Sequence, residues 1–354
     1  MKKHTQVTLN DIAKQFNVSK VTVSKALRGH PDISAALSKK IHALAKEWGY
    51  VPNYMARNLS AKQTRTIGVV VPKIAHFFFS SVIEAIYDTA FQHNYEIILT
   101  ISQENAEREI RHLQTLLSMR VDGIIISVTQ QTKDYSMFLR IRDMGVPLTF
   151  MDRVVNLEGF NFVVADDYNG AFAAAEQIIK AGYKKIGHIA GYLHTNIGNE
   201  RYSGFESAMK KYNVPVKSEY IVFGGFSEKD GYNGLMKLYQ TGNLPECIFA
   251  VTYPVALGIY EAAAELGLKI PDNLDVISFG KSRLNQFLSP PMSYIEQPTT
   301  ELGKKAFELT LESIKQKDKF TPQTIKLPTK LVLCNTCLGK DLFVGKRTAN
   351  AVLS

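Results

Sequence analysis

The chain has 354 residues, 45% of them hydrophobic, which is enough for two or three domains with substantial buried cores. No apolar run approaches the roughly 18 residues of a membrane span, and M-K-K-H-T-Q leads into a polar segment instead of a signal-peptide core. Cys247, Cys334 and Cys337 are too few for a disulfide framework. We therefore expect a globular protein of the cytoplasm without a membrane anchor.

The positive charge is concentrated at the amino end. Residues 1–66 contain 12 Lys and Arg against three acidic residues, a net charge of +9, whereas the other 288 residues hold 30 of each kind and are neutral overall. This asymmetry favours a polyanion-binding head on a neutral body. A merely solvated basic face is the alternative.

The apolar spacing after Val7 predicts three short helices. Thr8 and Asp11 can form a capping-box-like start for the first helix, over residues 8–16. Asn17 tolerates the left-handed backbone of a tight turn, and Ser19 can cap the second helix. Two helices joined by such a turn form a helix-turn-helix unit. The expected inward residues are Leu9, Ile12, Ala13 and Phe16, then Val23, Ala26 and Leu27, and, in a third helix after Ser34, Leu37, Ile41, Leu44 and Trp48.

The opposite face of the second helix has an unusual composition for a solvated surface. Lysine can donate to guanine O6 and N7, valine can contact a thymine methyl, and serine or threonine can donate to phosphates or base edges. We interpret this helix as a recognition helix for the major groove; an ordinary solvated helix in a small bundle is the alternative. The residues on this face are Lys20, Val21, Ser24, Lys25 and Arg28.

A short segment after the third helix also suggests DNA contact. Pro52 stops the third helix, and residues 53–61, capped by Asn53, form barely two turns, too few to persist alone. Ala56 and Leu59 share one face, so a paired copy could place two leucines between base steps in the minor groove. A plain interdomain linker is the alternative.

The stretch V-T-L-N-D-I-A-K-Q-F-N-V-S-K-V-T-V-S-K-A-L-R-G, followed by G-Y-V-P-N-Y-M-A-R-N-L, resembles the DNA-binding head and hinge of the lactose-repressor (LacI) family of bacterial transcription regulators. Lys25 stands where that family commonly has arginine, so we do not transfer a family operator sequence. The resemblance implies recognition-helix contacts at Ser19, Lys20, Val21, Thr22, Ser24 and Lys25, backbone anchors at Thr8, Tyr50 and Asn53, and minor-groove elements at Ala56 and Leu59.

From Ile67 onward, short apolar strands alternate with amphipathic helices. Such strands with helical crossovers predict an α/β body of two parallel sheets covered on both faces. The strands are expected at I-G-V-V-V-P, Y-E-I-I-L-T-I, D-G-I-I-I-S-V, V-P-L-T-F-M-D, F-V-V-A-D-D, K-K-I-G-H-I-A-G, Y-I-V-F-G-G, C-I-F-A-V-T and D-V-I-S-F-G. The helices are expected near 80–93, 105–119, 133–144, 168–181, 200–212, 228–241 and 254–266.

This series resembles the two-lobed, periplasmic-binding-protein-like body of the same family. The resemblance implies that the chain crosses between the lobes near 164–167, 294–298 and 325–330. We expect a helix-turn-helix head at 1–52, a hinge helix and linker at 53–64, a body at 65–340 and a tail at 341–354. Lobe 1 should comprise about 65–164 and 298–325, and lobe 2 about 166–294 and 330–340.

Ligands of such folds bind between the lobes, at the carboxyl ends of strands. In A-H-F-F-F-S, Phe78 and Phe79 are candidates for stacking on a flat ligand or on a sugar's C–H face. Core packing of one or two of Phe77, Phe78 and Phe79 is the alternative.

Other strand ends supply further candidates. Asp152 could accept hydrogen bonds from ligand hydroxyls, and Arg201 matches the position of a ligand-clamping arginine in the family. Surface ion pairs are the alternative, favoured more for Arg153 than for Arg201. Tyr253 and Phe279 complete the expected set.

Two departures from the family pattern affect the effector. Thr252 and Tyr253 stand where the family usually reads N-D, and Gly280 stands where it usually has an acidic residue. Two hydroxyl acceptors are therefore missing. A sugar or sugar derivative is the expected effector, with a simple sugar in doubt.

Several motifs of other protein classes are incomplete. F-G-K-S at 279–282 would need a glycine where Asp275 stands to form a phosphate-binding loop, and C-N-T-C at 334–337 lacks a second ligand pair for a metal. The histidines show no zinc-protease arrangement, and no G-x-S-x-G elbow is present. We expect neither an enzyme nor a metal or cofactor site.

Together these features predict a transcription regulator, repression being the usual outcome in the family. Its expected partners are a palindromic double-stranded DNA operator, a small-molecule effector that could be a saccharide, and a second copy in a homodimer or higher oligomer, because one head offers too small a surface for tight binding. We expect it to associate with the nucleoid and not with a membrane. The alternatives are a small-molecule binding protein or a sugar-processing enzyme without a DNA role.

Overall fold

The computed structural model describes residues 7–51, 63–75 and 77–339. The chain divides into two compact units, Met1–Thr64, here called the head, and Arg65–Ser354, here called the body. Each unit has its own hydrophobic core.

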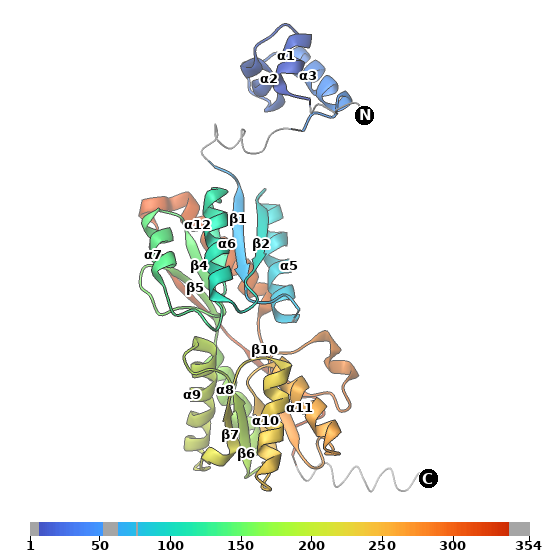
Figure 1. The fold of residues 1–354 in the computed structure, drawn as a ribbon, viewed down its shortest axis with the longest axis vertical. Helices are drawn as coiled ribbons and strands as arrows, with labels where there is room; N and C mark the ends of the chain where they lie inside the picture. The colour runs from blue at the N-terminus through green and yellow to red at the C-terminus, as the bar shows by residue number, and fades with distance from the viewer. Residues whose placement is uncertain (1–6, 52–62, 76, 340–354) are drawn as a thin grey trace, which may run out of the picture. The chain divides into compact units, whose positions relative to one another are not determined.

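The described residues of the head form three helices, which are α1 (Leu9–Gln15), α2 (Lys20–Leu27) and α3 (Ala35–Glu47) (Figure 1). The capping box of Thr8 and Asp11 is confirmed, and Asn17 adopts a left-handed φ of 50°. Ser19 and Ser34 cap the next two helices, as expected. The core of this small bundle consists of Ile12, Ala13, Val23, Ala26, Ile41 and Ala45.

The expectation for Trp48 was wrong. Its exposed fraction is 37%, because α3 ends at Glu47 and Trp48 is the residue that follows the last helical turn. Ala45, four residues after Ile41, takes the inner position instead. The core of the head is therefore built from small aliphatic side chains without the indole ring.

The described residues of the body form two six-stranded sheets, and the predicted fold class is confirmed. The sheet of lobe 1 has the order β11-β5-β4-β3-β1-β2, and all its neighbouring strands are parallel. Its strands are β1 (Thr66–Val71), β2 (Glu96–Ile101), β3 (Gly123–Ile126), β4 (Leu148–Met151), β5 (Asn161–Ala165) and β11 (Thr324–Leu327).

The sheet of lobe 2 has the order β12-β10-β9-β8-β6-β7 and is parallel except for its edge strand β12, which runs antiparallel to β10. Its strands are β6 (Ile186–Ala190), β7 (Ile221–Phe223), β8 (Cys247–Ala250), β9 (Asp275–Phe279), β10 (Ser293–Glu296) and β12 (Lys330–Val332).

Helices cover both faces of each sheet, so each lobe has two apolar cores (Figure 1). In lobe 1 the pairs are α5 (Phe77–Gln92) with α12 (Thr299–Gln316), and α6 (Ala106–Ser118) with α7 (Ser136–Asp143). In lobe 2 they are α8 (Asp167–Lys180) with α9 (Asn196–Lys211), and α10 (Glu228–Gln240) with α11 (Tyr253–Glu265). The described part of the body also forms three short 3₁₀ helices, which are η1 (Ser218–Tyr220), η2 (Arg283–Phe287) and η3 (Lys317–Lys319).

For the last part of the body, the sequence analysis gave lobe assignments and crossings from the family resemblance but no individual strands or helices. Strand β10 belongs to lobe 2, α12 and β11 to lobe 1, and β12 again to lobe 2. The chain therefore passes between the lobes after β5, after β10 and after β11. These three passages lie side by side and bring the strand ends of both lobes to a common cleft.

Candidate functional site

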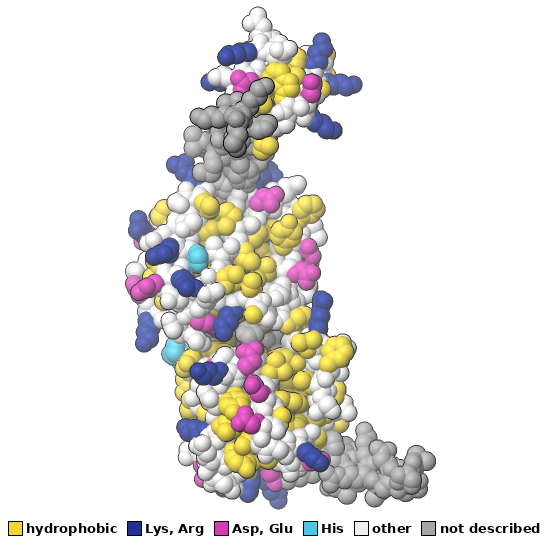
Figure 2. All heavy atoms as spheres, turned by 45° about the vertical axis from the view of Figure 1, so that its right-hand side comes forward, with side chains coloured by type: hydrophobic (Ala, Val, Ile, Leu, Met, Phe, Trp, Pro, Cys, Tyr) yellow, Lys and Arg dark blue, Asp and Glu magenta, His cyan; other side chains and the backbone are white. Residues whose placement is uncertain are grey.

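The outer face of α2 forms the first candidate site. Val23 and Ala26 point into the core of the head and are fully buried, which fixes the rotation of the helix. Lys20 and Arg28 are exposed on the outer face, and the exposed fraction of Val21 is 63%. Figure 2 shows Lys and Arg side chains spread over the head. The surface thus presents cations and one apolar group to solvent.

The hydroxyl groups at the start of this face are already engaged. The Ser19 Oγ accepts a hydrogen bond from the Thr22 backbone N–H at 3.0 Å and lies 2.9 Å from the Thr22 Oγ1. The Thr8 Oγ1 donates to the Asp11 carboxylate at 2.7 Å. These bonds hold the amino ends of α1 and α2 in place, so the three side chains stabilise the geometry that any DNA contact would require.

Lys25 is held by a partner inside the head. Its Nζ lies 2.8 Å from the Asp32 Oδ2, and this hydrogen bond is the first cause that lowers the pKa of Asp32. Arg28 donates from Nε to the Ser24 carbonyl at 3.1 Å. Both pairs are exposed, and such contacts exchange easily with other acceptors. Lys25 would have to leave Asp32 to reach a base.

The other expected DNA contacts lie near or beyond the end of the head's described residues. Tyr50 is half-buried against the core of the head, and this burial raises its pKa. Asn53, Ala56 and Leu59 lie outside the described residues. The structure therefore places seven of the twelve expected contacts on α2 or at its caps, besides Thr8 at the start of α1 and Tyr50 after α3.

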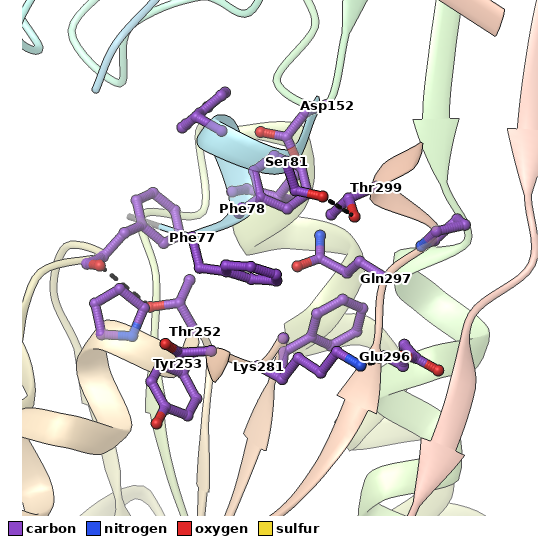
Figure 3. Close-up of a pocket in the computed structure, with 18 of the residues that line it drawn as sticks. Phe77, Phe78, Ser81, Asp152, Thr252, Tyr253, Lys281, Glu296, Gln297 and Thr299 are labelled. Carbon is purple, nitrogen blue, oxygen red and sulfur yellow. Dashed lines mark hydrogen bonds and ion pairs between the residues drawn. The ribbon is translucent and has the colours of Figure 1, made fainter. Parts of the chain in front are cut away.

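The second candidate site is a cavity of about 750 Å³ between the lobes of the body. In Figure 3, Phe78, Ser81 and Asp152 lie on one side, and Thr252, Tyr253 and Lys281 lie on the other. The crossover after β10 adds Glu296, Gln297 and Thr299. All six residues expected at an effector site line this cavity, namely Phe78, Phe79, Asp152, Arg201, Tyr253 and Phe279.

Arg201 is fixed at the base of the cavity. Its Nε and Nη2 lie 2.8 and 2.7 Å from the Asp167 Oδ1, and its Nη1 donates to the Val251 carbonyl at 2.7 Å. The guanidinium stacks on Phe279 with 3.8 Å between its carbon and the ring centre. Because the exposed fraction of Arg201 is 2%, this network pre-organises the arginine for a ligand.

Asp152 is the buried carboxylate of the cavity. It follows β4 with a left-handed φ of 59°, and the Ser127 Oγ lies 3.5 Å from its Oδ2. Burial raises the pKa of Asp152 to about 6, although Arg153 and Arg201 oppose that shift. The carboxyl group can therefore accept a hydrogen bond when ionised and donate one when protonated.

The three consecutive phenylalanines differ in their surroundings. Phe79 belongs to the core of lobe 1 with an exposed fraction of 5%, while Phe77 and Phe78 are half-buried. The rings of Phe78 and Phe79 meet edge to face, with centres 5.1 Å apart. Phe79 thus serves as a support in the cavity wall, and Phe77 and Phe78 offer the accessible rings.

The surface ion pair favoured for Arg153 was wrong. Its exposed fraction is 7%, and its Nη1 lies 2.7 Å from Glu104 Oε1, so the pair is inside the cleft. The guanidinium also lies 4.9 Å from the ring centre of Phe226, a lobe 2 residue. The sequence did contain a signal for this placement. Arg153 comes shortly after the predicted strand that became β4, and the carboxyl ends of parallel strands lie at the cleft.

The positions that depart from the family pattern have structural roles here. The Thr252 Oγ1 accepts from the Val255 N–H at 3.3 Å and donates to the Phe226 carbonyl at 3.1 Å. Gly280 has a φ of 84°, and a Cβ there would lie 2.9 Å from the Gln297 Oε1. A side chain at this position would be strained, so Gly280 offers no acceptor. Lys281 instead pairs with Glu296 at the rim.

The described residues contain no group of three His, Cys, Asp or Glu side chains placed to hold a metal ion. In C-N-T-C, Cys337 contacts Cys247 with 3.3 Å between sulfur atoms, so the two cysteines of the motif do not act as a pair. Within the same described ranges, no helix is long and apolar enough to span a bilayer.

A helix-turn-helix head and a two-lobed body with a ligand-sized cleft define the class of DNA-binding regulators that carry an effector-binding domain. Comparison with known protein families agrees with this class. Residues 8–53 match the family "Bacterial regulatory proteins, lacI family", and residues 64–334 match "Periplasmic binding proteins and sugar binding domain of LacI family". The chain therefore belongs to the LacI family.

Individual relatives support the same assignment. The chain is 31% identical over 327 residues to the HTH-type transcriptional repressor PurR of Actinobacillus pleuropneumoniae serotype 3, covering 92% of this chain and 97% of PurR. It is 30% identical over 326 residues to catabolite control protein A of Priestia megaterium, with coverages of 92% and 97%. These relatives are regulators of transcription, so the prediction that the chain is not an enzyme is confirmed.

Solved structures share the fold. The lac repressor dimer bound to operator and the anti-inducer ONPF is 24% identical, with a TM-score of 0.83 over 95% of this chain and all of that chain. A LacI-family regulator from Enterococcus faecium with bound ribose is 26% identical, with a TM-score of 0.67 over 76% of this chain and 97% of that chain.

Proposed function

We propose that this protein is a transcriptional repressor that binds a near-palindromic operator as a homodimer and responds to a small molecule in the cleft. The observation that carries the DNA part is the outer face of α2, where Lys20, Val21 and Arg28 stay exposed while the opposite face is buried. Such a face fits base edges and phosphates in a major groove. Nucleoid association in the cytoplasm follows from this role.

The dimer would form through the body. Lobe 1 exposes Tyr87, Phe91 and Leu99 on α5 and the edge strand β2, with exposed fractions of 55, 75 and 38%. Figure 2 shows hydrophobic side chains gathered on the face of the body turned to the viewer. Large apolar patches of this kind mark association surfaces. Phe91→Glu should yield monomers in sedimentation, whereas Phe223→Glu, at another exposed aromatic, should not.

The effector part rests on the lining of the main cavity. Phe77 and Phe78 can stack on a flat ring or a sugar's C–H face, and Asp152 can bond to a hydroxyl. The missing acceptors at Tyr253 and Gly280 favour a sugar derivative with an apolar portion over a simple sugar. An effector shifts occupancy only by its different affinity for the two lobe arrangements.

Selection of bound duplexes from a random pool tests the proposal, with the full chain and with or without a panel of saccharides and nucleosides. We expect a palindromic consensus whose recovery changes with one compound class. Affinity should fall steeply between low and moderate salt because phosphate contacts release counterions. A flat salt response or the absence of any consensus would contradict the proposal.

The hinge requires a separate variant. Leu59 lies outside the described residues, and the family resemblance alone assigns it to the minor groove. Leu59→Ala should abolish high-affinity binding to the selected site while weak non-specific binding remains. Unchanged affinity would remove Leu59 from the DNA contacts.

A further inference from the structure

Asp32 is an acidic residue beside the outer face of α2. The other two acidic residues of the first 66 lie elsewhere, because Asp11 completes the capping box of α1 and Glu47 is the last residue of α3. Asp32 lies in the connection between α2 and α3, and its side chain is 58% exposed. An anion at this place repels DNA phosphates and weakens the general attraction of the head for a duplex. A favourable role of Asp32 in DNA binding must therefore come from its neighbours or from the bases.

The carboxylate of Asp32 contacts Lys25, a cation of the expected reading face. The Lys25 Nζ lies 2.8 Å from the Asp32 Oδ2, and the lysine side chain is 34% exposed. The same Oδ2 lies 3.3 Å from the His30 Nδ1, which accepts the Asp32 backbone N–H at 3.4 Å. Ser34, and not Asp32, caps α3. Both charges of the Lys25–Asp32 pair reach solvent, so both can exchange partners when a duplex approaches.

The pair places a donor and an acceptor side by side, as the major-groove edge of a G·C base pair does. Guanine O6 and N7 are acceptors, and cytosine N4 is a donor. O6 and N4 are hydrogen-bonded to each other and therefore lie about 2.9 Å apart. The ammonium and carboxylate groups, 2.8 Å apart, match this spacing with complementary chemistry. An A·T pair is a weaker match, because it presents single acceptors on either side of the adenine N6 donor.

We propose that Lys25 and Asp32 together read one G·C base pair in each half-site, with Lys25 donating to guanine and Asp32 accepting from cytosine N4. This inference rests on the proposed DNA-binding role of α2 and adds Asp32 to the residues that determine its specificity. At the G·C pair each charge exchanges its partner for base atoms, so neither is left unpaired. At a phosphate only Lys25 gains a partner, and Asp32 loses the one it had.

The lysine at position 25 makes a second reader important. An arginine holds guanine O6 and N7 with a planar fork, whereas the lysine ammonium is a compact charge on a flexible stem. Such a charge is also satisfied by any phosphate oxygen, so Lys25 alone selects guanine weakly. Asp32 adds an acceptor that a phosphate cannot satisfy and that cytosine can. The pair therefore carries more sequence information than its lysine alone.

Fluorescence anisotropy with the full-length protein tests the proposal on the duplex selected from the random pool. Each base pair is replaced symmetrically in both half-sites. At one G·C pair, replacement by A·T should weaken binding of the wild type about tenfold. Asp32→Ala and Lys25→Met should each lose most of this preference, and the double variant should lose no more than the more affected single one. Glu47→Ala removes the same charge from an exposed position of α3 and should keep the preference.

Two modified bases test the assigned atoms directly. N4-methylcytosine replaces the groove-facing N–H of cytosine by a methyl group, and 7-deazaguanine lacks the N7 acceptor. With N4-methylcytosine at the G·C pair, the wild type should bind about tenfold more weakly, whereas Asp32→Ala should bind the modified and unmodified duplexes equally. With 7-deazaguanine, the wild type should lose affinity and Lys25→Met should not. A purely structural role of Asp32 in the head predicts no dependence on the cytosine N4 donor.

The outcomes separate this proposal from the proposed repressor function. If the wild type selects no duplex, the repressor proposal fails and the two-part reader fails with it. If the wild type selects a palindrome but Asp32→Ala keeps every base preference, only the two-part reader is overturned. Equal losses of the wild type and Asp32→Ala on N4-methylcytosine also overturn it. Thermal melting of the variants shows that their heads remain folded, because only an exposed ion pair is removed.

Discussion

The head and the body differ in the burial of their polar and charged side chains. Among the described residues of the head, no polar or charged side chain is buried, and its cations stand in solvent. Residues 67–354, which make up nearly all of the body, have no net charge. The body nevertheless buries the charged side chains of Arg153, Arg201, Asp152 and Asp167. A polyanion is attracted by exposed, exchangeable charges, whereas a small molecule is selected by fixed, desolvated ones.

The two regions should therefore respond differently to substitution. In the body, removing one charge leaves its buried partner uncompensated, which destabilises the fold. In the head, an exposed charge can be removed with little effect on stability but with loss of DNA affinity. The following variants sharpen this difference, from the largest expected effect to the smallest.

Arg201→Met should have the largest effect. It leaves the Asp167 carboxylate buried without its cation, at a cost of about 3 to 5 kcal/mol in the free energy of unfolding of the body. Urea unfolding of the full chain measures this. Arg142→Met is the matched control, because its pair with Asp143 is exposed, and it should cost less than about 1 kcal/mol. Equal costs for the two variants would contradict the comparison.

Ile41→Ala should destabilise the head alone. Ile41 is fully buried in a core of six aliphatic side chains, so we expect a loss of about 2 to 4 kcal/mol. Circular dichroism should show an earlier transition for the head and an unchanged one for the body. Ala43→Ser, at an exposed position of the same helix, is the control. A shift of both transitions would show that the two units do not unfold separately.

Glu109 should make the stability of the body pH-dependent. Burial raises its pKa to about 7, against the hydrogen bonds it accepts from Thr132 and the Thr129 N–H. The folded state therefore binds the proton more tightly, and the contribution of Glu109 to stability falls as pH rises from about 4.5 to about 7. As pH rises from 5 to 8, the free energy of unfolding of Glu109→Gln should increase relative to that of the wild type by about 1 to 3 kcal/mol, because only the wild type loses this proton.

Thermal unfolding at several pH values measures the Glu109 effect. Glu107→Gln, exposed on the same helix, provides the comparison. If the difference between Glu109→Gln and wild type is constant across this range, the carboxyl group does not titrate there and the burial argument fails.

Lys20→Ala should have the smallest effect on stability but a measurable one on DNA. Lys20 is exposed at the start of α2, so the free energy of unfolding should change by less than about 0.5 kcal/mol. Affinity for the selected duplex should fall several-fold, and the slope of its logarithm against log salt should decrease by about 1. Lys14→Ala, on α1, should leave the slope unchanged. If Lys14→Ala lost as much DNA affinity as Lys20→Ala, the effect of Lys20 would be non-specific attraction only.

Much of the fold was predictable because its signals are local. The capping residues of α1 and α2 and the period of each helix lie within a few residues of one another. The elements β10, α12, β11 and β12 were not predicted one by one, because only the family resemblance gave the lobe crossings near 294–298 and 325–330 and the lobe assignment of the segments between them. The six expected residues reached one cavity because each follows or faces a strand end, whereas Gln297 and Glu296 were missed at the crossover.

The sequence by itself determined the class of the protein. The charge of residues 1–66, the helix-turn-helix spacing and the alternation of strands and helices are properties of short stretches, and short-range interactions decide them. The tertiary structure decided which charges meet. Arg153 and Glu104 lie 49 positions apart and Arg201 and Asp167 lie 34 positions apart. They become partners only because the order of strands in the sheets brings distant loops and helix ends together. No local pattern encodes that order. The sequence and the family resemblance could point to single residues of the cleft, but the ion pairs among its buried charges could be known only from the fold.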